Sequence, residues 1–534
     1  MTKWVYLFEE GDSSMKPLLG GKGSGLAEMR NADLPVPPGF TITTEACREY
    51  YAHDKSFPQG MWQQSLESLK HIEEQTGKQF GDSENPLLVS VRSGAPVSMP
   101  GMMDTVLNLG LNPRTLNGLA KLTGDERFAW DAYRRFVQMF GEIVLGVPKE
   151  KLDRVMEDVD GYGQEANLDV DTLKAIVSRF QEVIVGEARQ EVPDAPYEQL
   201  RQAIAAVFDS WNNDRSIRYR RVNRIADDMG TAVSVQAMVF GNAGPNSGTG
   251  VAFTRHPSTG EPIIFGEYLT NAQGEDVVAG TRTPQPIARM EEELPDTYEQ
   301  LVQIANRLEN HYRDMQDIEF TIERGTLYML QTRTGKRTGR AAVRIAVDMH
   351  NEGIISEQEA VQRVRPDQLE QLLHPVIDPD VEVEVLTTGL PASPGAAAGR
   401  VVFNADEAEE LAEEGQDVIL IRHETNPDDY HGMVAAEAIV TARGGMTSHA
   451  AVVARGMGKC CVVGASDISI DYGQQMFTVG DATVSAGDYI TVDGNDGRII
   501  LGEVPTIDPE IDEYFETLMQ WANGNRRLGV RTNA

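Results

Sequence analysis

The sequence contains the stretch Thr441-Ala-Arg-Gly-Gly-Met-Thr-Ser-His-Ala-Ala-Val-Val-Ala-Arg-Gly-Met-Gly-Lys-Cys-Cys-Val-Val-Gly464, which predicts a strand, a Gly-Gly turn and a helix in succession. Thr447 and Ser448 can cap a helix of small residues that begins beside His449. Free N–H groups and the positive end of the helix dipole favour an anion there, so the fold itself would hold a phosphoryl group on this histidine. The same field keeps the ring neutral and nucleophilic. The alternative is an ordinary histidine at a helix start.

Length and charge limit the class of protein. A chain of 534 residues is too long for one core and predicts about three or four domains. The formal net charge of -34 argues against a nucleic acid or an anionic membrane as a partner. Cys47, Cys460 and Cys461 are too few and too poorly spaced for a disulfide framework or a cysteine zinc site. Because we find no signal peptide and no apolar run long enough to span a membrane, we expect a cytoplasmic protein.

The segment Leu18–Met29 predicts a glycine-rich turn that leads into a helix. It differs from a P-loop, because Lys16 occupies the position of the first glycine and Gly23 follows Lys22 where Ser or Thr belongs. Glycines let the backbone approach a ligand closely, and one lysine among them could clamp a nucleotide phosphate. Lys22 is therefore a candidate phosphate ligand, although the segment is not a P-loop.

Two strands carry charged residues of interest. Residues 87–94 predict a buried strand with Arg92 near its end, and an arginine there needs an anion, either a phosphate or one of the abundant carboxylates. Residues 317–333 predict a hairpin whose alternation puts Asp317 and Glu319 on one face, about 7 Å apart. Two such carboxylates can hold Mg²⁺ against a triphosphate. An ordinary amphipathic edge hairpin would alternate in the same way.

Residues 112–224 show helical periodicity with little strand signal and predict a helical insertion. Arg134 and Arg135 in this segment could face a phosphate or solvent, and the periodicity does not decide between them.

Several motifs resemble those of one family. Residues 444–451, Gly-Gly-Met-Thr-Ser-His-Ala-Ala, closely resemble the phosphohistidine signature of the pyruvate phosphate dikinase and phosphoenolpyruvate synthase family. Val89-Ser-Val-Arg-Ser-Gly94, Ala272-Gln-Gly-Glu-Asp276 and Gln331-Thr-Arg333 resemble its other motifs and occur in the family's order. The resemblance covers essentially the whole chain and is closer to the dikinases than to the synthases.

The resemblance implies a nucleotide site. Lys22 and Arg92 would contact phosphates, Asp317 and Glu319 would serve the metal and the nucleotide, and Gln331 and Arg333 would complete the phosphate site. The implied cofactor is Mg²⁺, and its expected ligands are Asp317, Glu319 and Gln331. Gln236 and Met238 resemble positions that line the adenine pocket.

The resemblance also makes His449 the catalytic phosphoryl carrier. The candidate neighbours of its phosphate are Arg135, Arg443, Thr447 and Ser448, with Arg422 and Arg455 as further candidates that could equally be surface or structural arginines. Thr447 is similar to a position that some members of the family use for regulatory phosphorylation.

The expected fold is multidomain, α/β and α+β, with an ATP-grasp nucleotide-binding domain interrupted by the helical insertion and followed by a swivelling phosphohistidine domain. The expected boundaries are an ATP-grasp subdomain at 1–111, the insertion at 112–224, a second subdomain with the metal hairpin at 225–337, a helical linker at 338–388, the phosphohistidine domain at 389–504 and a linker helix at 505–534.

The function implied by the resemblance is the ATP and phosphate half of a dikinase reaction, with ATP, inorganic phosphate, AMP and pyrophosphate as ligands. In this family similar residues lead into a barrel that binds pyruvate or phosphoenolpyruvate, and we expect that barrel to be missing from this chain. The alternatives are synthase-like chemistry or a phosphocarrier or regulatory subunit that passes the phosphoryl group of His449 to an acceptor on another chain.

Overall fold

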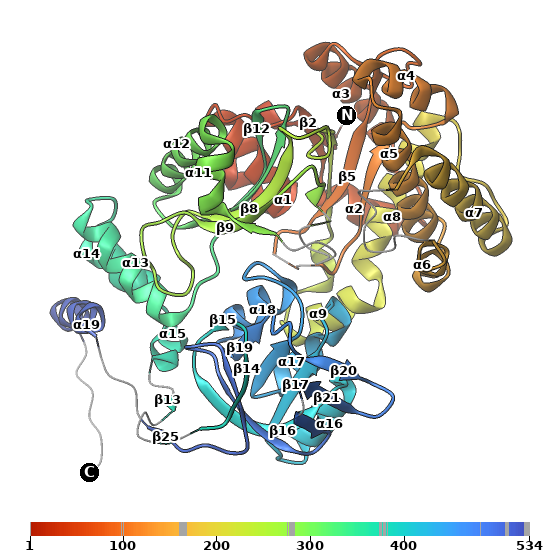
Figure 1. Ribbon diagram of the computed structural model, residues 1–534. Helices are drawn as coiled ribbons and strands as arrows, with labels where there is room; N and C mark the ends of the chain where they lie inside the picture. Colours follow the sequence, from red (N-terminus) through yellow and green to blue (C-terminus); the bar gives the residue numbers. More distant parts are fainter. Residues whose placement is uncertain are drawn as a thin grey trace. The chain divides into compact units, whose positions relative to one another are not determined.

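The computed structural model describes residues 2–97, 99, 101–159, 168–274, 276, 284–372, 376–377, 381, 383–480, 482–507 and 512–527 (Figure 1). It is a mixed α/β protein that divides into two compact units. Unit 1 comprises residues 1–249, 270–274 and 319–333, and unit 2 comprises residues 250–269, 275–318 and 334–534. The predicted Ala272–Asp276 motif and the predicted helical linker at 338–388 lie partly outside the described residues.

Unit 1 is built on a five-stranded sheet with the strand order β1-β2-β7-β5-β6. The strands are β1 (Val5–Leu7), β2 (Gly39–Ile42), β7 (Ala232–Ala237), β5 (Val89–Gly94) and β6 (Thr105–Leu109), and each pairs antiparallel with its neighbours. Every residue of β7 is buried, which fits a central strand covered on both faces. The strand predicted at 87–94 is thereby confirmed.

The glycine-rich segment differs from its prediction. The helix α1 (Lys16–Asn31) begins before the glycines, and the expected turn is a kink at Gly20, which has φ 70° and ψ 171°. A Cβ at Gly20 would lie 1.7 Å from the carbonyl oxygen of Gly94 on β5, so only glycine permits this approach of helix to strand. The kink leaves Lys22 in the first turn of the helical segment that follows it.

The described part of residues 112–224 is mostly helical and contains no strand, as predicted. Their helices are α4 (Pro113–Thr123), α5 (Glu126–Met139), α6 (Lys149–Glu157), α7 (Val170–Ala188), α8 (Pro196–Asp209) and α9 (Asp214–Val222). With α2 (Thr44–Ala52) and α3 (Met61–Thr76), all of these helices except α9 contribute to one large apolar core that also contains the buried faces of β2, β5 and β7.

A second five-stranded sheet has the order β10-β9-β8-β11-β12. Its strands are β8 (Gly248–Phe253), β9 (Phe265–Thr270), β10 (Gln285–Pro286), β11 (Gln316–Glu323) and β12 (Thr326–Thr334). The β11–β12 pair is the hairpin predicted at 317–333. The helix α12 (Pro295–Tyr312) precedes β11, and α13 (Gly339–Asn351) follows β12.

The part of the chain around His449 forms an eight-stranded sheet with the order β14-β24-β23-β16-β17-β18-β19-β15. Its central strands are parallel: β16 (Ala396–Val402), β17 (Val418–Arg422), β18 (Ala438–Thr441) and β19 (Cys460–Val463). The crossovers contain α16 (Ala405–Glu413), α17 (Tyr430–Ala435) and α18 (His449–Met457). The carboxyl ends of β17 and β18 therefore meet at one edge, where the loops before α17 and α18 begin.

The remaining strands of this sheet are antiparallel to their neighbours. They are β14 (Val385–Thr388), β15 (Leu390–Ser393), β23 (Tyr489–Asp493) and β24 (Arg498–Leu501). Residues 385–388, which the sequence assigns to the linker, thus supply an edge strand that pairs with β24. A small sheet of β20 (Ser469–Asp471), β21 (Met476–Val479) and β22 (Ala482–Ser485) lies between β19 and β23 in the chain.

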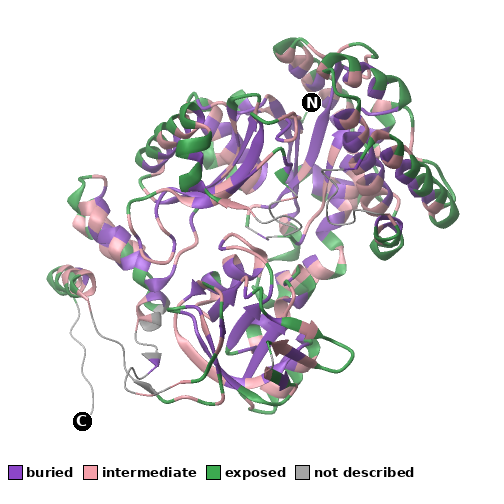
Figure 2. Cartoon of the chain, in the orientation of Figure 1, coloured by how far each residue is buried: buried purple, intermediate pink, exposed green. Residues whose placement is uncertain are grey.

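Further helices follow α13 in unit 2. They are α14 (Glu357–Arg363) and α15 (Pro366–Gln371), and α19 (Glu513–Asn525) packs on α13 and α14 with Leu518 buried. Figure 2 shows that buried residues concentrate in the sheets, while many helices present an exposed face to solvent. In the described ranges, no helix combines the length and the apolar character needed to cross a bilayer.

Candidate active site

His449 is the first residue of α18, as predicted. Ser448 has the extended backbone of an N-cap, and its hydroxyl accepts a 3.5 Å hydrogen bond from the backbone N–H of Ala451. The predicted role of Ser448 as a helix cap is therefore confirmed. His449 consequently lies beside the unsatisfied N–H groups and the positive end of the helix dipole, where an anion is favoured.

The two ring nitrogens of His449 have different surroundings. Nδ1 lies 3.1 Å from the hydroxyl oxygen of Thr425, whereas Nε2 has no hydrogen-bond partner within the described part of the chain. Burial and the positive charge of Lys336 lower the pKa of His449 to about 4, so the ring is neutral at pH 7. When Nδ1 carries the proton and donates a hydrogen bond to the hydroxyl oxygen of Thr425, Nε2 has a free lone pair and can act as a nucleophile.

Thr425 was not among the residues that the sequence indicates. It is buried and lies after β17, 24 residues before His449. Only the parallel pairing of β17 with β18 brings its loop to the start of α18. The sequence feature that could have indicated Thr425 is its place in the loop after a predicted strand. Many threonines in such loops have no functional role, so this feature alone does not identify it.

Thr447 is held by a carboxylate from a distant strand. Its hydroxyl donates a 2.8 Å hydrogen bond to Glu267 of β9, and the backbone N–H of Met446 donates to the same carboxylate at 3.3 Å. Burial raises the pKa of Glu267, although these hydrogen bonds oppose the shift. Glu267 precedes Thr447 by 180 residues, and the sequence did not indicate it.

The three arginines near His449 in sequence have different environments. Arg422 pairs with Asp429 at 3.1 Å, and Arg443 has an exposed side chain. Arg455 is only 2 % exposed, and its guanidinium donates to the carbonyl oxygens of Ala451 and Met446. Burial lowers the pKa of Arg455 to about 10. Arg455 therefore shapes the turn before α18, while Arg443 remains the accessible candidate for a phosphate.

In unit 1 the structure brings together Lys22, Arg92, Glu319 and Arg333. Glu319 lies 3.3 Å from Arg92 and 3.8 Å from Arg333. Burial acts to raise the pKa of Glu319, but Arg333, Arg92 and Lys22 together lower it. Burial lowers the pKa of Lys22 to about 7, with the charges of Arg92 and Arg333 acting in the same direction. Three basic side chains around one carboxylate leave an excess of positive charge, which suits a polyanion.

The donor set of the hairpin fits Mg²⁺ bound jointly with a phosphate. Asp317 and Glu319 are two residues apart on β11, and Gln331 lies on the adjacent strand β12. All three offer oxygen ligands, and Mg²⁺ usually takes one or two carboxylates together with substrate phosphates. The described residues contain no cluster of three or more His, Cys, Asp or Glu side chains that could hold a metal by itself.

A cavity of about 250 Å³ in unit 1 is lined by apolar residues that include Leu88, Met238 and Phe240, with Glu323 among its polar groups. Glu323 follows Glu319 by four residues on β11, so the two side chains lie on the same face of that strand. Four residues of strand span about 13 Å. The cavity therefore lies farther along β11 than the charged cluster.

The two residues expected at the adenine pocket differ in the structure. Met238 lines the cavity, and its contact with adenine stays a prediction. Gln236 is 1 % exposed, and its amide donates a 3.2 Å hydrogen bond to the carbonyl oxygen of Pro37. Its side chain therefore ties β7 to the loop before β2.

Arg135 lies on α5 and pairs with Asp131 at 3.1 Å, and Arg134 pairs with the same carboxylate at 2.9 Å. Burial acts to raise the pKa of Asp131, but the two arginines hold it well below its usual range. Both arginines thus compensate a buried charge within their own helix, which is the structural alternative to a phosphate contact.

The chain matches models of two protein families. The model described as the AMP/ATP-binding domain of pyruvate phosphate dikinase matches residues 16–59, 54–295 and 288–353. The model of the mobile domain of PEP-utilising enzymes matches residues 414–497. The first match covers unit 1 with its charged cluster and cavity, and the second covers α18 with His449.

Curated relatives match over the full length of this chain. It is 55% identical over 540 residues to pyruvate, phosphate dikinase from Clostridium symbiosum, covering 100% of this chain and 62% of the relative. It is 52% identical to the enzyme of the same name from Rhizobium meliloti, with the same coverage. It is also 52% identical to a chloroplastic pyruvate, phosphate dikinase from Arabidopsis thaliana, covering 98% of this chain and 55% of the relative. The chain thus spans less than two thirds of the length of these relatives.

Proposed function

Because the chain belongs to the pyruvate phosphate dikinase family, we propose that it carries the half-reaction in which ATP and phosphate give AMP, pyrophosphate and a phosphorylated His449. The observation that carries this proposal is the neutral ring of His449 at the start of α18, with Nε2 unpartnered among the described residues. A nucleophile at a helix N-terminus is suited to accept and hold a phosphoryl group.

The nucleotide site of the proposal is an ATP-grasp fold with subdomains at 1–111 and 225–337, interrupted by the helical insertion at 112–224. Lys22, Arg92 and Arg333 bind the triphosphate, and the cavity beside Met238 takes the adenine. The excess of basic side chains around Glu319 supports the phosphate assignment.

The metal of the proposal is Mg²⁺, held by Asp317, Glu319 and Gln331 together with the nucleotide. When bound, it neutralises phosphate charge that develops during transfer. Lys22 supplies a further positive charge once the nucleotide's own charge has raised its pKa, and Arg92 and Arg333 orient the phosphates.

The transfer itself balances in two steps. The Nε2 lone pair of His449 attacks the β-phosphorus of ATP, the bond from that phosphorus to the α,β-bridging oxygen breaks, and AMP leaves with the electron pair. Inorganic phosphate then attacks the γ-phosphorus, and the bond from it to the β,γ-bridging oxygen breaks. Pyrophosphate forms, and the β-phosphoryl group stays on Nε2. The proton on Nδ1 remains hydrogen-bonded to Thr425 throughout.

The second half of the proposed reaction gives the phosphoryl group to pyruvate, forming phosphoenolpyruvate on a barrel domain of the kind that the family resemblance implies. The domain that carries His449 swivels between the two sites. Its sheet includes the edge strand Val385–Thr388, so the domain begins before the expected boundary at 389. A cytoplasmic location, where these metabolites occur, belongs to the same proposal.

The test is to incubate the protein with Mg²⁺ and ATP labelled in the β-phosphate, with and without inorganic phosphate, and to measure acid-labile label on His449. With phosphate added, we expect a single labelled phosphoryl group on His449 and the release of pyrophosphate. His449→Gln should carry no label. A single phosphoryl group that forms on His449 equally without added phosphate would indicate synthase-like chemistry, because the first proposed step alone leaves a pyrophosphoryl group. No label, with ATP binding intact, would refute the proposed half-reaction for this chain.

A further inference from the structure

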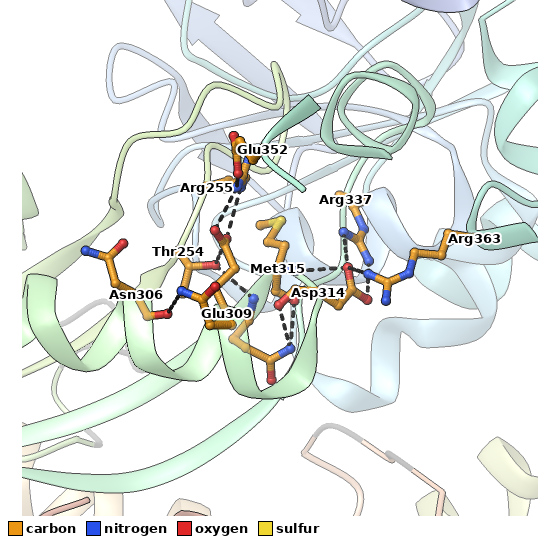
Figure 3. Close-up of polar contacts among 11 residues, drawn as sticks. Thr254, Arg255, Asn306, Glu309, Asp314, Met315, Arg337, Glu352 and Arg363 are labelled. Atoms are coloured by element: carbon orange, nitrogen blue, oxygen red, sulfur yellow. Dashed lines mark hydrogen bonds and ion pairs between the residues drawn. The ribbon is translucent and has the colours of Figure 1, made fainter. Parts of the chain in front are cut away.

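The loop between β12 and α13 is fixed at several points in unit 2. The backbone N–H of Gly335 donates to Met315 at 3.0 Å, and Arg337 makes two 2.8 Å hydrogen bonds to Asp314. Arg363 of α14 pairs with the same carboxylate at 3.3 Å, and Figure 3 shows both arginines converging on it. This network leaves little freedom to the backbone of the one residue between Gly335 and Arg337.

The segment that carries Asp314 is itself anchored. Arg255 lies between Glu309 of α12 and Glu352, with 2.8 Å and 2.5 Å hydrogen bonds from its Nη2 to the two carboxylates (Figure 3). Thr254 donates a 2.8 Å hydrogen bond to Glu309 and accepts one from the backbone N–H of Gln316 at 3.0 Å. Buried ion pairs with several hydrogen bonds specify a single arrangement, so the loop after β12 starts from a defined position.

The residue between these anchors is Lys336, and its side chain reaches α18. A Cβ placed at Gly456 would lie 2.9 Å from Nζ of Lys336, so the side chain passes directly over this glycine. Gly456 follows His449 by seven residues in α18. Seven residues are about two helical turns, so both residues lie on the same face of the helix.

The charge of Lys336 also acts on the ring of His449. Among the described residues, the charge that acts on the ring is that of Lys336 in the loop after β12, and the uncharged Thr425 in the loop after β17 lies 3.1 Å from Nδ1. A positive charge there disfavours the imidazolium form, and it favours any anion attached to the ring. Lys336 therefore opposes protonation of the His449 ring before phosphoryl transfer and stabilises the negative charge of the phosphoryl group afterwards.

We propose that Lys336 is the cation that stabilises the phosphoryl group on His449, and that the loop after β12 delivers it to the face of α18 on which the histidine lies. The proposal rests on the proposed function of His449. Lys336 stays protonated and makes or breaks no covalent bond; its ammonium group moves on a flexible stem toward the phosphoryl oxygens. It thereby contributes transition-state stabilisation that Thr425 cannot supply.

The first test is the rate at which β-labelled ATP labels His449 in the full chain. Lys336→Met keeps the length of the side chain and removes the charge, and we expect labelling to slow by about tenfold or more. Lys336→Arg keeps the charge and is expected to restore most of the rate. The affinity for ATP should be the same in all three proteins, because the charge acts at the histidine.

Gly456→Ala provides an independent test on the opposite side of the contact. The added methyl would displace the flexible end of Lys336 and leave the helix intact. We expect slower labelling, by severalfold. The matched control is Gly186→Ala in α7, where an added Cβ meets nothing within 4 Å, and its labelling rate should equal that of the unaltered protein.

The second readout is the ring pKa of His449, followed by NMR on protein labelled with ¹⁵N-histidine. It should rise in Lys336→Met and stay low in Lys336→Arg. A Lys336→Met variant with an unchanged labelling rate and an unchanged ring pKa would overturn the proposal, as would slow labelling that arginine does not rescue. If the unaltered protein is not labelled at all, the proposed half-reaction fails, and the ring pKa alone still decides the effect of Lys336.

Discussion

The hydrogen bond between Thr425 and Nδ1 of His449 determines which ring nitrogen can react. Thr425→Val keeps the shape of the side chain but removes the acceptor, so the proton is no longer retained at Nδ1. We expect His449 labelling to slow by about tenfold or more, because a fraction of the rings then carries the proton on Nε2. Thr425→Ser should keep most of the rate.

The ¹⁵N shifts of the ring distinguish the two tautomers and give this prediction a second measurement. The unaltered protein and Thr425→Ser should show the form protonated at Nδ1, and Thr425→Val a mixture; the signal is assigned by its loss in His449→Gln. Equal tautomer populations and equal rates in all three proteins would show that Thr425 has no positioning role.

We expect Lys22 to couple nucleotide binding to the uptake of a proton. Its pKa is about 7 in the free protein because it is buried beside Arg92 and Arg333. At pH 8 it is therefore largely neutral, and a bound triphosphate raises its pKa and makes it take up a proton. Calorimetric titration with ATP at pH 8, in buffers of different ionisation enthalpy, should show uptake of a proton in the unaltered protein and less uptake in Lys22→Met. The exposed Lys121→Met serves as the control. Identical uptake in all three would contradict this assignment.

Among the elements, α1 depends most directly on a single glycine. A Cβ at Gly20 would collide with the carbonyl oxygen of Gly94, and the residue has a positive φ of 70°. Gly20→Ala should therefore lower the free energy of unfolding by about 1–3 kcal/mol, measured by urea unfolding. In the exposed interior of α7, Gly186→Ala should raise it by about 0.5–1 kcal/mol. A Gly20→Ala variant as stable as the unaltered protein would mean that α1 can straighten.

The Gly20→Ala variant also tests whether the position of α1 affects nucleotide binding. If α1 shifts to relieve the collision, Lys22 moves with it, and ATP affinity should fall in Gly20→Ala but not in Gly186→Ala. Unchanged ATP affinity in a destabilised Gly20→Ala variant would separate the stability of the helix from nucleotide binding.

At the scale of the whole molecule, the two compact units should respond differently to nucleotide. Lys22, Arg92, Arg333 and the cavity all belong to unit 1. Mg²⁺ and ATP at about 100 times the dissociation constant should add about 2.7 kcal/mol to the stability of whichever transition unfolds this unit. Scanning calorimetry of the full chain measures this as an upward shift of one transition. The shift should be absent in Lys22→Met, and its persistence there would place the nucleotide elsewhere.

Much of the local structure and part of the site could be predicted from the sequence. The strand around Arg92, the hairpin of Asp317 and Glu319, and the helix that starts at His449 all follow from alternation, capping residues and glycines, which act over a few residues. The helix α1 was the exception, because its kink at Gly20 is set by close approach to β5, which no local pattern records.

The sequence by itself determined the elements and the residues that can do chemistry, because propensity, capping and charge are properties of short stretches. The tertiary structure alone decided their partners. It placed Thr425 against Nδ1 of His449, Glu267 against Thr447, and Lys336 along the face of α18. These contacts join segments far apart in the chain, and strand pairing and burial, which set both the distances and the pKa of His449, exist only in the folded molecule.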